Sequence, residues 1–158
     1  MKILVATDGS DFSTAAINML ANVVSNPATT AVKIVSAVEL QAMLPSNGLV
    51  AVSAGYYDDV QQSLREQAQQ SVAQAETEIR SLFPGGLLDL TTEVSDGSPS
   101  RVIVETAENW EADLIVIGSH GYGFWSRALL GSVSNSVVHH APCSVLVVRT
   151  APADTPGK

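Results

Sequence analysis

One segment of the sequence carries most of the residue types that could bind a phosphate. It reads Gly118-Ser119-His120-Gly121, then nine residues, then Gly131-Ser132. Glycine permits positive φ angles and a close approach of the backbone to a ligand. Ser132 stands where a helix is predicted to begin, so the free amides of Ser132 to Ser134 could point at an anion. The segment therefore predicts a phosphate site built from backbone N–H groups.

The same glycines have a second interpretation, in which they only shape a turn and a helix end. For an isolated pair of glycines that interpretation is favoured. Here the second Gly-Ser pair stands at a helix start, and the whole segment follows a predicted buried strand, which favours a ligand. A second polar turn, Thr7-Asp8-Gly9-Ser10, follows another apolar run. Asp8 could accept hydrogen bonds from a ligand there, or it could cap the next helix.

Both turns need a scaffold that holds them close together, and the rest of the chain predicts one. Short apolar runs, typical of strands covered on both faces, alternate with stretches of helical periodicity. We predict strands over Ile3–Thr7, Ala31–Val38, Leu88–Val94, Asp113–Ile117 and Val145–Val148. This alternation predicts an α/β fold with a parallel sheet and helices on both faces. Such sheets bind ligands outside the carboxyl ends of their strands, where both turns stand.

Helix-start signals stand between these strands. We predict a first helix capped by Asp11 or Ser13. Further helices are predicted to begin at Asp58 or Asp59, at Ser98-Pro99 with the serine hydroxyl as cap, and at about Ser132. The last of them ends near His140, before Ala141-Pro142. The stretch from Glu39 to Asp58 is irregular, and loops of this length in compact domains are usually functional or mobile.

The composition is that of one folded domain. The chain has 158 residues, of which 46% are hydrophobic and 15% charged, and its net charge is −8. We predict one domain over residues 1–150 and a flexible tail over 151–158. The acidic balance argues against nucleic acid or an anionic membrane as a partner. The absence of a run of about 20 apolar residues and a lone cysteine predict a cytoplasmic protein.

Sites for a metal or for catalysis are not predicted. His139 and His140 are adjacent on a helix and cannot face the same way, and Cys143 follows a proline into a strand. Cys143 is therefore interpreted as a packed thiol and not as a metal ligand. The chain has no Gly-x4-Gly-Lys-Ser/Thr motif. Without a positioned base or an invariant lysine, fast phosphoryl transfer is not expected.

Together these motifs resemble the universal stress protein family. The glycine spacing matches the ATP-binding branch of that family, and the opening strand with its Thr7–Ser10 turn and the closing segment His140–Val148 also look like it. The resemblance covers Lys2 to Arg149. It implies a flavodoxin-like five-stranded parallel sheet in the order 3-2-1-4-5. It also implies a homodimer, and ATP bound at the ends of strands 1 and 4.

The resemblance also implies roles for single residues toward the base and the ribose. Asp8 would accept hydrogen bonds from the ribose hydroxyls, a role that suits a carboxylate facing a vicinal diol. Val38 would contact the base, largely through its backbone. The remaining residues on this side would be Ala6 and Thr7 beside the adenine, and Ile117 and Gly118 under the ribose.

Toward the phosphates, the resemblance implies that His120 and Gly121 flank them. The cradle itself would be formed by amides and hydroxyls of Gly131, Ser132, Val133 and Ser134. Many members carry arginine where His120 stands, so compensation of the phosphate charge is expected to be weaker here and pH-dependent. Within the spacer, Arg127 could reach a phosphate or be solvated, and Trp125 could cover the loop or contact a partner.

The implied function is that of a nucleotide-dependent regulator in a stress response. ATP, with Mg or Mn bound through its phosphates, would order the glycine loop and the stretch 39–58 and change a surface offered to a regulatory protein. AMP, ADP or a cyclic nucleotide fit the same pattern. Two alternatives stay open: a slow metal-dependent ATPase, and a nucleotide-free dimeric interaction module whose pocket is closed by Tyr122 or Trp125.

The apolar run Ser144–Val148 predicts how two copies would associate. The implied strand order places it at the edge of the sheet, and an apolar edge invites pairing with another chain. Two copies related by a two-fold axis would pair these strands antiparallel. The alternative is that the tail Thr150–Lys158 covers the edge, but Pro152 and Pro156 make it a poor strand. We therefore predict a homodimer through residues 144–148.

Overall fold

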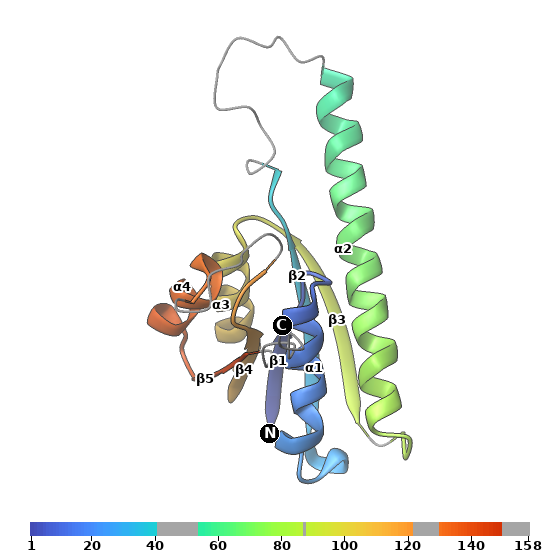
Figure 1. Ribbon diagram of the computed structural model, residues 1–158, viewed down its shortest axis with the longest axis vertical. Helices are drawn as coiled ribbons and strands as arrows, with labels where there is room; N and C mark the ends of the chain where they lie inside the picture. Colours follow the sequence, from blue (N-terminus) through green and yellow to red (C-terminus); the bar gives the residue numbers. More distant parts are fainter. Residues whose placement is uncertain (41–53, 87, 122–129, 150–158) are drawn as a thin grey trace, which may run out of the picture.

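The computed structural model describes residues 1–40, 54–86, 88–121 and 130–149 (Figure 1). Five strands form one sheet in the order β3-β2-β1-β4-β5, and every neighbouring pair is parallel. The strands are β1 (Lys2–Ala6), β2 (Ala31–Val38), β3 (Asp89–Asp96), β4 (Leu114–Gly118) and β5 (Ser144–Val148). The predicted fold class and strand order are therefore confirmed.

Helices cover both faces of this sheet. The helices are α1 (Asp11–Val23), α2 (Ala54–Leu82), α3 (Pro99–Asn109) and α4 (Ser132–His140), with a 3-10 turn η1 (Pro27–Thr29). On one face, Ile17 and Leu20 of α1 and Ile79 of α2 pack against alternate side chains of the strands. On the other face, Ile103 of α3 and Val137 of α4 pack against the intervening ones. Burial on both faces explains why the central strands are continuously apolar.

Two helix starts differ from the predictions, and a third agrees in position. The cap of α1 is Ser10, whose side chain accepts a hydrogen bond from the N–H of Ser13, and neither Asp11 nor Ser13 is the cap. Helix α2 begins at Ala54, inside the stretch predicted to be irregular. Ser98 does cap α3 by position, but its side chain makes no capping hydrogen bond. At α1, three polar residues (Ser10, Asp11 and Ser13) stand near the start, and the sequence does not say which of them caps the helix.

Several predictions concern residues outside the described part of the chain. They are the roles of Tyr122, Trp125 and Arg127, most of the stretch 39–58, and the tail 151–158. Among the described residues, no helix combines the length and the apolar character needed to cross a membrane.

The sheet brings the two polar turns of interest together because β1 and β4 are neighbours in it. The N–H of Thr7, just after β1, donates to the carbonyl of Val35 in β2 (3.0 Å). The N–H of Ser119, just after β4, donates to the carbonyl of Val148 in β5 (2.8 Å). Each turn thus leaves the sheet at a fixed point, and both leave from the carboxyl edge.

Candidate functional site

A cavity of about 490 Å³ opens at the carboxyl ends of β1 and β4. A volume of this size lies within the range of about 300–1,000 Å³ typical of small-molecule sites. Eleven of the twelve predicted site residues line it: Ala6, Thr7, Asp8, Ile117, Gly118, His120, Gly121, Gly131, Ser132, Val133 and Ser134. Segments more than a hundred residues apart in the chain therefore meet around one space.

Asp8 is exposed at the rim of this cavity, and its carboxylate is oriented by the turn that follows it. The backbone N–H and the hydroxyl of Ser10 both donate to Oδ1 of Asp8, at 3.0 and 2.6 Å. Thr7, which is buried, holds the same turn from inside: its Oγ1 accepts from the N–H of Gly9 and donates to Oγ of Ser13. The carboxylate is thus part of a local turn and also a cavity wall.

The first turn of α4 lies across the cavity from this carboxylate turn. Its cap is Gly131, and the amides of Ser132, Val133 and Ser134 come first in the helix, where no carbonyl of the preceding turn can accept from them. The N–H of Gly131 donates to the carbonyl of Ser119 (2.8 Å), which ties the helix start to the end of β4. This geometry is suited to an anion.

The hydroxyl of Ser134 differs from its predicted role as a phosphate donor. It is buried, and it donates toward the carbonyls of Ser119 (2.9 Å) and Gly131 (3.0 Å). The hydroxyl therefore helps to connect the start of α4 to the end of β4, as the N–H of Gly131 also does. Ser132, by contrast, is exposed at the first helical position. The hydroxyl of Ser134 fastens the helix start, while its amide still belongs to the first turn.

None of the three glycines of the motif has a positive φ, and a side chain would meet the tightest space at Gly118. In the described residues, positive φ among glycines occurs at Gly9, Gly86 and Gly97. A Cβ on Gly118 would lie 2.7 Å from the backbone of Phe12 in α1, and one on Gly131 would lie 3.2 Å from the carbonyl oxygen of Ser119. The structural interpretation of these glycines is thus correct in part: Gly118 is needed by the packing of α1 on β4 with no ligand present.

His120 forms part of the wall next to the carboxylate turn. Its ring is tilted against that of Phe12, with centroids 5.3 Å apart, and its Nδ1 lies 3.1 Å from Oγ of Ser119. Among the described lining residues, Asp8 is the carboxylate and His120 the basic side chain. Neutralisation of a bound phosphate by this part of the wall therefore depends on amides and on one imidazole.

Val38 is the one predicted site residue that the structure does not place in this cavity. It lines a second cavity of about 390 Å³ at the ends of β2 and β3, together with Gly97, Ser98 and Arg101. Its backbone carbonyl accepts a hydrogen bond from the N–H of Gly97 (2.9 Å). A contact of the base with this carbonyl would therefore share it with Gly97.

The cavity also contains residues that the sequence analysis did not select. They are Ser13, Val35, Ser36, Ala37, Pro99 and Ile103. Strand register could have found three of them, because Ala6 is paired with Val35 and the next two residues continue along the same edge. With Ile117 and Val133, the apolar members give the cavity a wall that suits a flat ring. Polar groups of the two turns occupy the rest.

The histidines and the cysteine near the end of α4 have other partners. Nδ1 of His139 and of His140 lies 2.8 Å from the carbonyl oxygen four residues earlier in each case. Burial first, and then the charge of Asp113, raise the pKa of the Cys143 thiol above its ordinary value. No cluster of three potential metal ligands is present among the described residues.

Comparison with known proteins gives a consistent result. The model of the universal stress protein family matches residues 1–149. Universal stress protein MJ0531 of Methanocaldococcus jannaschii is 33% identical over 148 residues, which are 94% of this chain and 81% of that protein.

Solved structures agree on the architecture. Hypothetical protein MJ0577 superposes with a TM-score of 0.79 at 22% identity, over 96% of this chain and 97% of that one, which supports the fold. A universal stress protein in complex with cAMP superposes with a TM-score of 0.65 at 25% identity, over 96% of this chain and 98% of that one.

Proposed function

The chain belongs to the universal stress protein family, and from that premise we propose that it binds an adenine nucleotide, ATP foremost, in the cavity between the Asp8 turn and α4. The observation that carries this proposal is the meeting of a carboxylate, a helix N-terminus and an apolar wall around one space. The relative solved with cAMP supports the class of ligand.

Each part of the nucleotide has a matching part of the cavity. The base would lie against the apolar wall that includes Val35 and Ile103. The ribose hydroxyls would donate to Asp8, and the phosphates would accept from the amides that begin at Ser132. Because the described wall offers His120 as its one basic side chain, a divalent cation bound through the phosphates would reduce the remaining charge.

We further propose that nucleotide binding is the regulated event and that the chain acts in the cytoplasm as a nucleotide-dependent regulator. A ligand that touches both turns would favour one arrangement of the carboxyl edge over others. The affinity of a protein partner that binds this edge would then depend on whether nucleotide is bound. The partner would recognise the conformation of this edge. No chemical group needs to be transferred to the partner, because a population shift changes only which conformation is occupied.

The nucleotide proposal is tested on the purified full chain. Acid release followed by mass spectrometry identifies any nucleotide that copurifies, and calorimetric titration of stripped protein with ATP, AMP and cAMP ranks their affinities. We expect adenine nucleotides to bind and ATP to bind best in the presence of Mg²⁺. Prolonged incubation of ATP and Mg²⁺ with the protein should yield no more ADP than a blank. Steady production of ADP would make the protein a slow ATPase.

We also propose the homodimer through β5. This strand lies at the edge of the sheet, where Val145, Leu146 and Val147 are half-buried. Val147→Arg should convert a dimer into a monomer at micromolar concentration, as measured by sedimentation velocity, because a charge would stand in the apolar seam. Thr92→Arg on β3, the opposite edge, is the matched control and should leave the dimer intact. A wild-type monomer, or a dimer that tolerates Val147→Arg, would contradict this proposal.

A further inference from the structure

The carboxylate of Asp8 is held on one side only. Both hydrogen bonds from Ser10 end at Oδ1, at 3.0 Å from the backbone nitrogen and 2.6 Å from the hydroxyl. These two bonds fix the plane of the carboxylate, since a rotation about its bond to Cβ would move Oδ1 away from both donors. The second oxygen, Oδ2, is consequently directed toward the β4 turn, on the side of Gly121.

Gly121 provides the space into which Oδ2 is directed. A Cβ on Gly121 would lie 2.7 Å from Oδ2 and 3.8 Å from Cγ of Asp8, and among the described residues other than its chain neighbours no further group would come within 4 Å. Gly121 has no positive φ that would demand a glycine. Among the described residues around Gly121, the position of the Asp8 carboxylate is therefore the reason for a glycine.

We propose that Gly121 is a positioning residue that lets Asp8 present Oδ2 to the ribose, and that this contact makes the site selective for nucleotides with an intact ribose diol. The inference rests on the proposed nucleotide function. A carboxylate oxygen accepts from hydroxyl donors, and charge-assisted bonds of this kind are among the strongest in proteins. It assigns Gly121 to the ribose, whereas the resemblance assigns it to the phosphates.

A methyl group at position 121 should displace the Asp8 carboxylate without disturbing the fold. The Asp8 side chain is exposed, so it can swing away from Gly121→Ala at little cost to the fold. It cannot do so and keep both Ser10 donors on Oδ1. The variant should therefore fold as the wild type does and lose the ribose contact. Gly118→Ala cannot serve this purpose, because its Cβ would meet the backbone of Phe12.

The experiment compares ATP with 2′,3′-dideoxy-ATP by calorimetric titration. Wild type should prefer ATP by about ten- to a hundredfold, the worth of a hydrogen bond to a charged group. Gly121→Ala and Asp8→Ala should each bring this preference close to one, and the double variant should lose no more. Affinity for the dideoxy analogue should change by less than about threefold in all of them. Gly85→Ala, whose Cβ would meet nothing within 4 Å, is the matched control and should behave as wild type.

A variant of Ser10 and the affinities of the two analogues distinguish the role of Gly121 from other roles. Ser10→Ala removes the hydroxyl donor to Oδ1 without touching position 121, and should lower the preference for ATP in part; an unchanged preference overturns the orientation argument. If Gly121→Ala weakens ATP and the dideoxy analogue equally, Gly121 serves the phosphates and the proposal is wrong. A wild type that binds both analogues equally refutes this inference alone, whereas a wild type that binds neither refutes the proposed function as well.

Discussion

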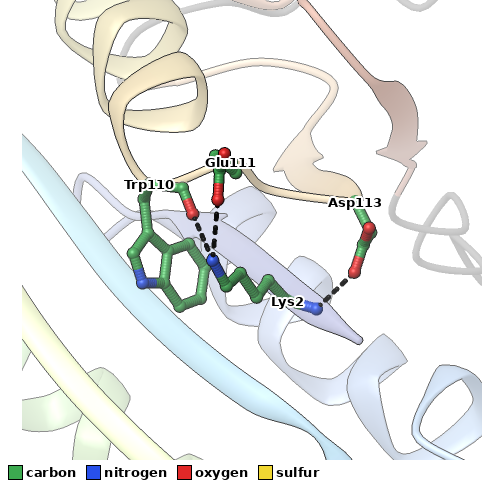
Figure 2. Close-up of polar contacts among 4 residues, drawn as sticks. All are labelled: Lys2, Trp110, Glu111 and Asp113. Atoms are coloured by element: carbon green, nitrogen blue, oxygen red, sulfur yellow. Dashed lines mark hydrogen bonds and ion pairs between the residues drawn. The ribbon is translucent and has the colours of Figure 1, made fainter.

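The two ends of β1 and β4 carry the same kinds of polar group and use them differently. At the amino end, the backbone N–H of Lys2 donates to Oδ2 of Asp113 (2.7 Å), and Nζ of Lys2 donates to the carbonyl of Trp110 (3.0 Å) and pairs with Glu111 (Figure 2). These groups bond to one another. At the carboxyl end, the Asp8 carboxylate and the first amides of α4 border an open cavity.

The amino-end cluster, defined as Lys2, Lys33, Trp110, Glu111 and Asp113, also includes contacts between two ammonium groups and one aromatic ring. The ammonium groups of Lys2 and Lys33 lie 5.9 and 5.4 Å from the centre of the Trp110 ring. Glu111 has a φ of 54° at the end of α3, a position that usually favours glycine. The comparison teaches that the polar groups at the amino end connect β1 to the end of α3, whereas the Asp8 carboxylate and the first amides of α4 are the groups that we propose for a ligand.

The largest effect on stability is expected at the carboxyl end, at Gly118. Gly118→Ala would place a Cβ 2.7 Å from the backbone carbon and oxygen of Phe12. Overpacking of this kind costs about 1–3 kcal/mol, which lowers Tm by roughly 2–4 °C per kcal/mol in a chain of this size. Thermal unfolding followed by circular dichroism measures it. A Tm equal to that of Gly85→Ala would show that α1 adjusts, and that the glycine is there for the ligand.

A smaller effect is expected at the amino end. Lys2→Met keeps an unbranched apolar side chain and removes the ammonium that donates to the Trp110 carbonyl and lies over its ring. Loss of this hydrogen bond should cost about 0.5–1.5 kcal/mol of unfolding free energy and leave nucleotide affinity unchanged. Arg80→Met, which removes an exposed ion pair within α2, is the control and should cost less. A change in nucleotide affinity for Lys2→Met would break the distinction between the two ends.

The smallest effect is expected from pH, through the Glu93 partner of Lys33. Burial raises the pKa of the Glu93 carboxyl, but hydrogen bonds from Ser95, Lys33 and Thr106 and the Lys33 charge outweigh it, so the pKa is below its ordinary value. A lowered pKa stabilises the fold above the unfolded pKa of about 4.3, and this stability is lost as pH falls through the folded pKa. The difference in unfolding free energy between wild type and Glu93→Gln, measured in urea, should shrink as pH drops below about 4. A difference that grows instead would contradict the assigned cause.

The strands and most element boundaries could be predicted from local signals, whereas the strand order was implied by the resemblance to the family. Continuous apolar runs marked the strands, and α4 begins and ends where its serine and proline signals place it. The start of α2 could not be predicted in this way. Its apolar stripe begins at Val60, while the helix already begins at Ala54, so the periodic pattern gives no sign of where the helix starts.

The site was predictable where it follows a strand and unpredictable where it depends on side-chain partners. Asp8 and the Gly131-Ser132 pair stand directly after strands or at a helix start, so topology alone brings them together. The hydroxyl of Ser134 has its hydrogen directed to backbone carbonyls, and Val38 lines a neighbouring cavity. Both outcomes depend on distances between segments remote in sequence, which no local pattern contains.

The central claim is that the first amides of α4 hold the phosphates, and Ser132 allows a direct test of it. Gly131 already has the extended conformation that a following proline requires (φ −61°, ψ 159°), and proline is favoured at the first helical position. Ser132→Pro therefore removes one N–H from the cradle and should keep the helix, while Ser132→Ala removes the hydroxyl and keeps the N–H. The two variants differ at this position chiefly in that amide.

The decisive measurement is the calorimetric affinity for ATP with Mg²⁺ of these two variants. We predict that Ser132→Pro binds ATP at least about tenfold more weakly than Ser132→Ala, as expected for a lost hydrogen bond to a charged group, with the two unfolding at similar temperatures. Equal affinities for ATP in two folded variants would contradict the account, because the Ser132 amide would then contribute nothing to binding.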